Sequence, residues 1–216
     1  MLGVLAFSLS AAACPLESLA SSVPAAAPSV VASDSLKAAW EGGQRWTDFH
    51  AAVNRRRDVW DRSWSSAASL PDTVAARARS AGPWRILVIT EPGCSDSANS
   101  VPYIARLVER APGLELRLIN STAGKPWMET HRTPDGRAAT PTVLVLDDAF
   151  RIRGCWVEQP RALQDFWLPI VARNETGSRF EEKMAWYVKD EGREILREIV
   201  DVLEGAKADA PVCRRG

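Results

Sequence analysis

The 216-residue chain lacks an excess of charge of either sign: lysine plus arginine total 27, and aspartate plus glutamate total 27. A balanced chain has no overall field that attracts polyanions, so we expect no binding to nucleic acid. The basic run "NRRR" at 54–57 is interpreted as a solvated helix face rather than a binding patch. The length suits one main domain with extensions.

Paired metal-ligand motifs are also missing. The four cysteines are Cys14, Cys94, Cys155 and Cys213. None of them forms a C-x-x-C pair, which argues against a zinc site and against a disulfide scaffold. The two histidines, His50 and His131, are interpreted as ordinary polar positions, because neither has a cluster of ligands near it in the sequence. We therefore expect no metal and no cofactor.

Long apolar runs are absent as well. The opening "MLGVLAFSLSAAAC" is apolar over about 12 residues, too short to span a bilayer but suited to a signal peptide, although a positive start is missing. Cys14 after "SAAA" is similar to a lipoprotein cleavage site, with Ala11 where leucine is usual. We expect 1–33 to be a leader, and the protein to be periplasmic or secreted. Membrane contact would require a lipid on Cys14; the alternative is a disordered cytoplasmic extension.

Apolar spacing predicts a mixed α/β domain over 34–205 and a flexible tail over 206–216. Helices are expected in 35–66 with a break at 42–43, and over 72–79, 95–110, 125–132 and 178–204, the last with a capping box at Ser178 and Glu181. Strands are expected over 84–90, 114–120, 142–147 and 150–157. The first two strands flank a helix and should be parallel, whereas the last two should form an antiparallel hairpin.

One thiol stands at the junction of a strand and a helix. The run "WRILVIT" ends in the turn "EPGC", and a helical pattern begins at Ser95. Unpaired amides and the helix dipole favour an anion at such a position, so Cys94 is a candidate nucleophile held as a thiolate. The alternative is a cysteine that only fills space, but the turn around it is polar.

These residues resemble the thioredoxin superfamily. Strand, "EPGCSDS", helix with Pro102 eight residues after the cysteine, and "ATP" before a hairpin occur in that order. The chain is more closely similar to bacterial thioredoxin-like proteins with a W-C-[GP]-D-[SAC] loop, through "WMET" at 127–130, "GCW" and "QPR" around 154–161, and "YVKDEGRE" at 187–194. The resemblance implies a thioredoxin-like fold with an N-terminal helical extension, a long C-terminal helix, and a cis bond at Thr140-Pro141.

The loop departs from that family at two positions. Ser97 occupies the place of the second cysteine, so a mixed disulfide cannot be resolved within the loop. Gly93 stands where the family usually has tryptophan, which removes part of the wall beside a bound partner. Cys213 and Cys155 are the candidates for a resolving thiol, although Cys155 fits a core position better.

The resemblance assigns roles to the remaining residues of the loop. Cys94 would be the nucleophile, and the Ser97 hydroxyl would donate a hydrogen bond to its thiolate. Gly93, Ser95 and Asp96 would contact substrate, with Asp96 either opposing the thiolate or capping the helix. Thr140 and Pro141 would clamp an added strand.

Three functions fit this reading. The leading one is monothiol thiol-disulfide exchange with protein or low-molecular-weight thiols and disulfides. The second is a redox-inactive binding or chaperone-like module that kept the scaffold. The third, a peroxidatic or redox-sensing thiol, is disfavoured because no arginine lies in the loop itself.

Overall fold

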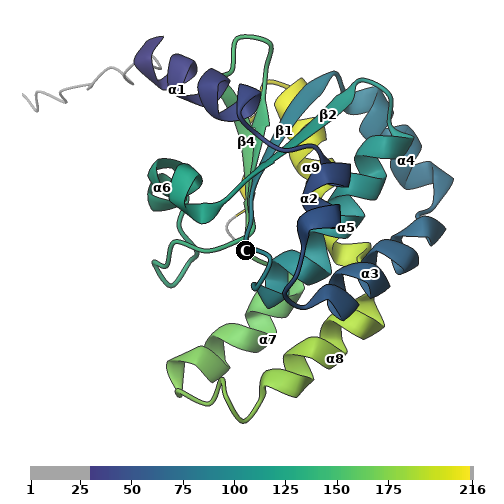
Figure 1. Cartoon of the computed structure of the whole chain (residues 1–216), viewed down its shortest axis with the longest axis vertical. Helices are drawn as coiled ribbons and strands as arrows, with labels where there is room; N and C mark the ends of the chain where they lie inside the picture. The colour runs from purple at the N-terminus through teal and green to yellow at the C-terminus, as the bar shows by residue number, and fades with distance from the viewer. Residues whose placement is uncertain (1–29, 215–216) are drawn as a thin grey trace, which may run out of the picture.

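The computed structural model describes residues 30–214 (Figure 1). The predicted leader therefore falls mostly outside the described residues, as does Cys14. Positions 30–33 belong to the first helix, α1 (Val30–Glu41). No described helix is both long enough and apolar enough to cross a membrane.

The described residues form both helices and strands, which alternate only in the middle of the chain. The helices are α1, α2 (Trp46–Ala52), α3 (Arg57–Ser66), η1 (Ala67–Ser69), α4 (Asp72–Ala81), α5 (Ser95–Arg110), α6 (Ser121–Thr130), α7 (Arg161–Ala172), α8 (Phe180–Asp190) and α9 (Arg193–Lys207). The strands are β1 (Trp84–Ile89), β2 (Leu114–Ile119), β3 (Thr142–Leu146), β4 (Ile152–Val157) and β5 (Cys213–Arg214).

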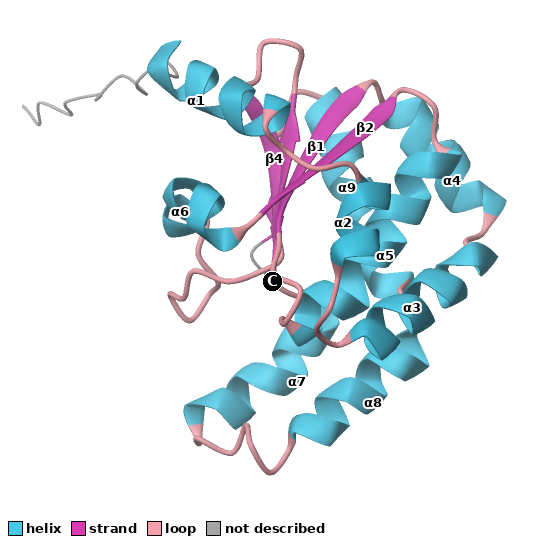
Figure 2. Ribbon diagram, in the orientation of Figure 1, coloured by secondary structure: helices cyan, strands magenta, loops and turns pink. Residues whose placement is uncertain are grey.

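The described strands form one mixed sheet in the order β2-β1-β3-β4-β5 (Figure 2). β1 and β2 are parallel, in the register Trp84 to Leu114, with α5 as the crossover between them. β3 pairs antiparallel with both β1 and β4. The predicted parallel pair and the predicted hairpin are thus confirmed.

Successive residues of β1 face opposite layers of the molecule, as expected for a strand that is buried on both sides. Ile86 and Val88 pack against the larger layer, which includes α2 to α5 and α9. Leu87 faces the smaller layer, where α1 and α6 lie (Figure 1). All three side chains have no exposed surface.

The C-terminal helices differ from the prediction. The segment 161–172 is a helix that was not predicted, because it contains Pro169 and a proline usually interrupts a helix. The predicted helix over 178–204 is two helices, since Glu191 and Gly192 adopt positive φ and turn the chain between α8 and α9. The Ser178–Glu181 capping box does not form: Arg179 is the N-cap of α8.

Part of the predicted flexible tail over 206–216 has regular structure within the described residues. Positions 206 and 207 extend α9, and Cys213 pairs with Cys155 of β4 in the parallel strand β5. These two cysteines form a disulfide across a sequence separation of 58. The pairing of Cys155 with Cys213 was not predicted, because sequence spacing carries no sign of a strand that returns to the sheet after a long helix.

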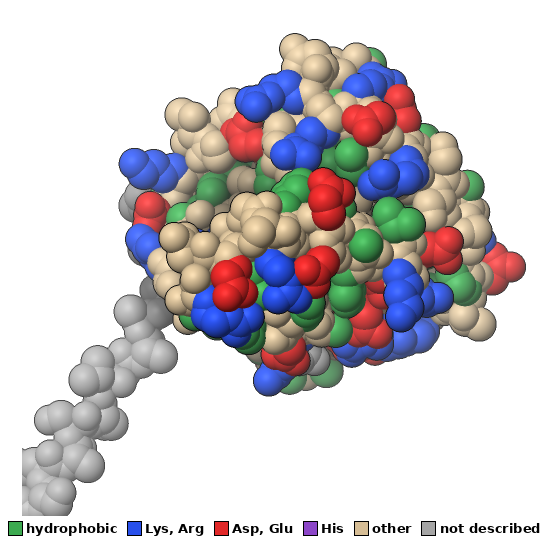
Figure 3. Space-filling model, turned by 90° about the horizontal axis from the view of Figure 1, so that it is seen from below, with side chains coloured by type: hydrophobic (Ala, Val, Ile, Leu, Met, Phe, Trp, Pro, Cys, Tyr) green, Lys and Arg blue, Asp and Glu red, His purple; other side chains and the backbone are tan. Residues whose placement is uncertain are grey.

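Charged side chains of both signs alternate on the face shown in Figure 3. This distribution matches the equal totals of basic and acidic residues in the sequence.

The turn at Gly192 generates a prediction about stability. Its φ is +76°, and a Cβ there would lie 2.3 Å from the ring of Tyr103. We expect Gly192→Ala to lower the free energy of unfolding by roughly 3 kcal/mol, through backbone strain and overpacking together. Urea unfolding followed by tryptophan fluorescence measures the change.

Gly177→Ala is the matched control, since no atom lies within 4 Å of a Cβ built there and its φ is not in the positive region. We expect that variant to stay within about 0.5 kcal/mol of the parent. Equal stability of the two variants would contradict the account of the α8–α9 turn.

Candidate functional site

Cys94 is the N-cap of α5. A tight turn delivers it, because the Cys94 amide donates to the Glu91 carbonyl at 3.0 Å and the Cys94 carbonyl accepts from the Ala98 amide at 3.0 Å. The Cys94 Sγ accepts a hydrogen bond from the Ser97 amide at 3.5 Å. The sulfur therefore takes the place that a serine or aspartate oxygen has in ordinary capping. The cysteine is partly exposed, so a partner can reach it.

A second loop faces the sulfur. The Cys94 thiol donates to the Thr140 carbonyl, with Sγ and O 3.2 Å apart. The Thr140–Pro141 peptide bond is cis, the configuration that the resemblance implied. The loop is anchored on both sides, because Thr142 Oγ1 donates to the Ala139 carbonyl at 2.7 Å and the Glu158 amide donates to the Pro141 carbonyl at 2.7 Å.

The Ser97 side chain does not have its predicted contact. It is fully buried, and its Oγ has no hydrogen-bond partner among the described residues. The backbone amide of Ser97, and not its hydroxyl, contacts the sulfur. Ser97 therefore contacts Cys94 only through its backbone, as part of the first turn of α5.

Asp96 points into the interior instead of toward substrate. Its carboxylate accepts hydrogen bonds from Lys183 Nζ at 2.9 Å and from Tyr187 Oη at 2.7 Å, both donated from α8. All three side chains are buried. Asp96 neither caps α5 nor faces the thiol unpaired, which corrects both predicted roles. Substrate contact by Asp96 is likewise unsupported.

The Tyr187 phenol remains a hydrogen-bond donor in this arrangement. Burial, reinforced by the negative charge of Asp96, raises the pKa of Tyr187 well above its usual value. Lys183 and Tyr187 stand four residues apart, so they lie on the same face of α8. Sequence reasoning noted Tyr187 only as part of a motif and missed Lys183. Their i, i+4 spacing opposite a loop aspartate is the signal that could have found the pair.

Two arginines from the N-terminal extension lie against the loop. The Arg56 Nε donates to the Gly93 carbonyl at 2.8 Å. A Cβ on Gly93 would lie 2.9 Å from the Arg55 guanidinium carbon, so the missing side chain leaves room for this group. Arg55 thus occupies part of the space that a side chain at position 93 would need. Residues 54–57 are exposed, as predicted, but only Arg57 is helical, and Arg55 and Arg56 lie against the loop.

The extension also supports the loop from within the core. The fully buried Trp60 of α3 donates from its indole Nε1 to the Pro92 carbonyl at 3.0 Å. Ser95, the first residue of α5, is half-buried, and its carbonyl accepts from the Asn99 side chain at 2.8 Å. The loop from Pro92 to Ser95 is therefore held at both ends.

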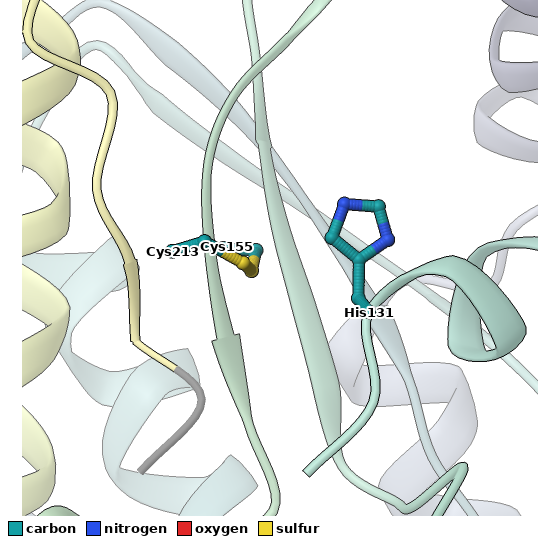
Figure 4. Close-up of side chains that lie close together, drawn as sticks. All are labelled: His131, Cys155 and Cys213. Atoms are coloured by element: carbon teal, nitrogen blue, oxygen red, sulfur yellow. A yellow bond between two sulfur atoms is a disulfide. The ribbon is translucent and has the colours of Figure 1, made fainter. Parts of the chain in front are cut away.

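The two proposed resolving cysteines lie elsewhere. Cys155 and Cys213 are joined to each other, so neither carries a free thiol in this structure. His131 lies beside them, and one of its ring nitrogens and the two sulfurs are all within 4.8 Å of one another (Figure 4). His131 has no cluster of potential metal ligands near it in the sequence, but the fold brings these two sulfurs close to it.

The sequence model of the thioredoxin family matches residues 43–176, more than half of the chain. The chain therefore belongs to the thioredoxin family, in agreement with its fold. No curated protein matches it.

Two solved structures share the fold. A protein of unknown function from Pseudomonas aeruginosa has a TM-score of 0.61 and 22% identity, over 78% of this chain and 96% of its own. An HIV epitope scaffold has a TM-score of 0.59 and 19% identity, over 78% of this chain and 97% of its own.

The buried ion pair generates a second prediction. We expect Lys183→Met to lower the free energy of unfolding by roughly 3–5 kcal/mol, because it leaves the Asp96 carboxylate buried without its cation. Chemical denaturation of the two proteins side by side measures the difference.

Lys189→Met is the control, since Lys189 lies on the same helix and is exposed. It should change stability by less than about 0.5 kcal/mol. The double variant Asp96→Asn/Lys183→Met should recover part of the loss. If Lys183→Met behaved like Lys189→Met, Asp96 would not depend on Lys183.

Proposed function

We propose that the protein performs monothiol thiol-disulfide exchange through Cys94. The observation that carries the proposal is the position of the Cys94 sulfur between the Ser97 amide and the Thr140 carbonyl at the exposed start of α5. Backbone amides at a helix start stabilise the thiolate, which is the attacking form. Thiolate attack on a partner disulfide joins Cys94 to one partner sulfur and releases the other as a thiolate. An external thiolate then attacks the partner sulfur of this mixed disulfide, forms a disulfide with the partner, and releases Cys94 as a thiolate.

The Thr140 carbonyl would have a different function at each stage. In the free protein it accepts from the Cys94 thiol. A mixed disulfide has no thiol hydrogen, so the same carbonyl would accept a backbone N–H from an extended partner instead. This is recognition by strand addition, in which main-chain hydrogen bonds give affinity for peptides of varied sequence.

Arg55 and Arg56 favour partners that carry negative charge. Both side chains are exposed, and both contact Gly93, the residue directly before Cys94. The nearby Glu91 carboxylate is already bonded to the Ser121 amide at 2.8 Å and to its hydroxyl at 2.6 Å, at the start of α6. The two arginines therefore present positive charge to an arriving disulfide.

A redox-inactive binding module remains the second candidate. It is favoured by the absence of a resolving thiol among residues 30–214: Ser97 takes that place in the loop, and Cys155 and Cys213 are bonded to each other. In this case the Thr140 loop would bind peptides without covalent turnover.

Export is the location that we propose for the chain. The Cys155–Cys213 disulfide supports it, because disulfides persist in oxidising compartments and are rare in the cytosol.

Intact mass spectrometry of the Cys14→Ser chain with glutathione disulfide tests the exchange, Cys14 being replaced in every variant so that its thiol forms no adduct of its own. We expect one glutathione adduct per chain at Cys94, removed by reduced glutathione. Cys94→Ser should form no adduct, while Cys155→Ser/Cys213→Ser should still form one at Cys94. An unmodified Cys14→Ser chain under these conditions would leave the binding module as the better reading.

The charge preference is tested by comparing exchange rates with glutathione disulfide, which is anionic, and cystamine, which is cationic. We expect Arg55→Gln to lower the ratio of the two rates about fivefold at low salt, because one nearby charge in water contributes about 1 kcal/mol. The effect should shrink as salt is added. Arg85→Gln, at the opposite end of β1, is the control and should leave the ratio unchanged. An equal shift in both variants would mean that net charge alone sets the ratio.

A further inference from the structure

A second cluster of reactive groups lies apart from the Cys94 loop. It consists of Cys155 in β4, Cys213 in β5 and His131, which directly follows α6 (Figure 4). One ring nitrogen of His131 and both sulfurs lie within 4.8 Å of one another. The monothiol exchange proposed above has no use for these three side chains.

The fold brings the three residues together from distant parts of the chain. Cys155 is fully buried on the sheet face that α1 and α6 cover. β5 places Cys213 beside Cys155, and the Cys155 amide donates to the Val212 carbonyl at 3.0 Å. His131 is the C-cap of α6, and its amide donates to the Trp127 carbonyl at 3.0 Å.

The imidazole is oriented by a hydrogen bond. His131 Nδ1 lies 2.8 Å from the Trp127 carbonyl oxygen, and since a carbonyl only accepts, Nδ1 carries the hydrogen. In the neutral ring Nε2 is then the unprotonated nitrogen and the one suited to coordinate a cation. Metal-binding histidines commonly have this support, in which the other ring nitrogen donates to a carbonyl or a carboxylate.

We propose that Cys155, Cys213 and His131 form a zinc site when their disulfide is reduced. Two external thiols would each supply one electron and one proton, forming an external disulfide and two cysteine thiols. Zn²⁺ would then bind both sulfurs as thiolates and release their two protons. Exchange with an external disulfide, which is reduced to two thiols, would re-form the Cys155–Cys213 disulfide and expel the ion.

The geometry suits Zn²⁺. Zinc–sulfur distances of about 2.3 Å and zinc–nitrogen distances of about 2.0–2.1 Å in a tetrahedron put ligand atoms about 3.5–3.8 Å apart. The His131 nitrogen already lies within 4.8 Å of both sulfurs, so it need approach them by only about an ångström. The two sulfurs must separate by about 1.7 Å from their bonded distance of about 2.05 Å once the disulfide is reduced. β5 has two residues and lies at the sheet edge, so Cys213 can move to separate the sulfurs. Two thiolates and an imidazole match the preference of zinc, and water would take the fourth position.

The alternative is that the disulfide only fastens the C-terminal segment to the sheet. In that case His131 would be a neighbour without a function toward the sulfurs, and the reduced cysteines would have no more affinity for a soft cation than any pair of thiols.

Titration with Co²⁺ as a spectroscopic probe for zinc separates these readings. The protein is the full chain with Cys14→Ser and Cys94→Ser, so that Cys155 and Cys213 are its only thiols, reduced under anaerobic conditions and freed of reductant. We expect one equivalent of Co²⁺ to give the visible bands of a tetrahedral site and a thiolate-to-cobalt charge-transfer band. Zn²⁺ should displace the Co²⁺, and the oxidised protein should show neither band.

Variants show whether all three residues act together. His131→Ala and His131→Gln should each weaken Zn²⁺ binding at least about tenfold, the lower end of the range for a lost supporting residue in a zinc site. Cys155→Ser/Cys213→Ser should abolish the charge-transfer band, and His50→Ala should leave binding unchanged. Unaltered affinity in both His131 variants would overturn the proposal, as would a reduced chain that binds no Co²⁺ or loses its far-UV circular dichroism.

Discussion

The buried contact between Asp96 and α8 fixes the first turn of α5 relative to α8. Asp96 is the second residue of α5, and its carboxylate accepts from Lys183 and Tyr187, which lie far along the chain. A carboxylate without compensation could not stay in the interior, so the first turn of α5 and the face of α8 must remain together. Cys94 caps that first turn, and its position consequently depends on α8 as well as on α5.

The same contact changes the electrostatics of the thiol. A carboxylate two residues from a cysteine would ordinarily oppose a thiolate, but Lys183 lies 2.8 Å from Asp96 and compensates its charge. On the solvent side, Arg55 and Arg56 lie against Gly93. The surroundings of the sulfur are thus set by one buried ion pair, two exposed cations and the amides of the helix start.

Sequence patterns were sufficient for the parts of the fold that local chemistry determines. The apolar run of β1, the amphipathic α5 and the β3–β4 hairpin were predicted, as was the position of Cys94 at the strand–helix junction. The separation of α8 from α9 was not, because Glu191 adopts a left-handed conformation that its residue type does not favour. Helix α7 was missed because Pro169 argued against it.

Long-range contacts account for the remaining differences. The Lys183–Asp96 pair joins residues 87 apart, and the Arg56–Gly93 bond joins residues 37 apart. Contacts between residues so far apart produce no periodic pattern in the sequence. The disulfide was missed for the same reason, since Cys213 reaches Cys155 only after α9 has crossed the sheet.

The short strand β5 also shields β4. An outer strand presents rows of unpaired amides and carbonyls that can template association with other chains. Cys213 and Arg214 pair with β4, and the Gln44–Leu118 bridge occupies part of β2 on the other side. Proteolytic removal of residues 208–214 would take β5 away and leave β4 as an unpaired edge strand. β5 therefore protects the protein against self-association through this edge.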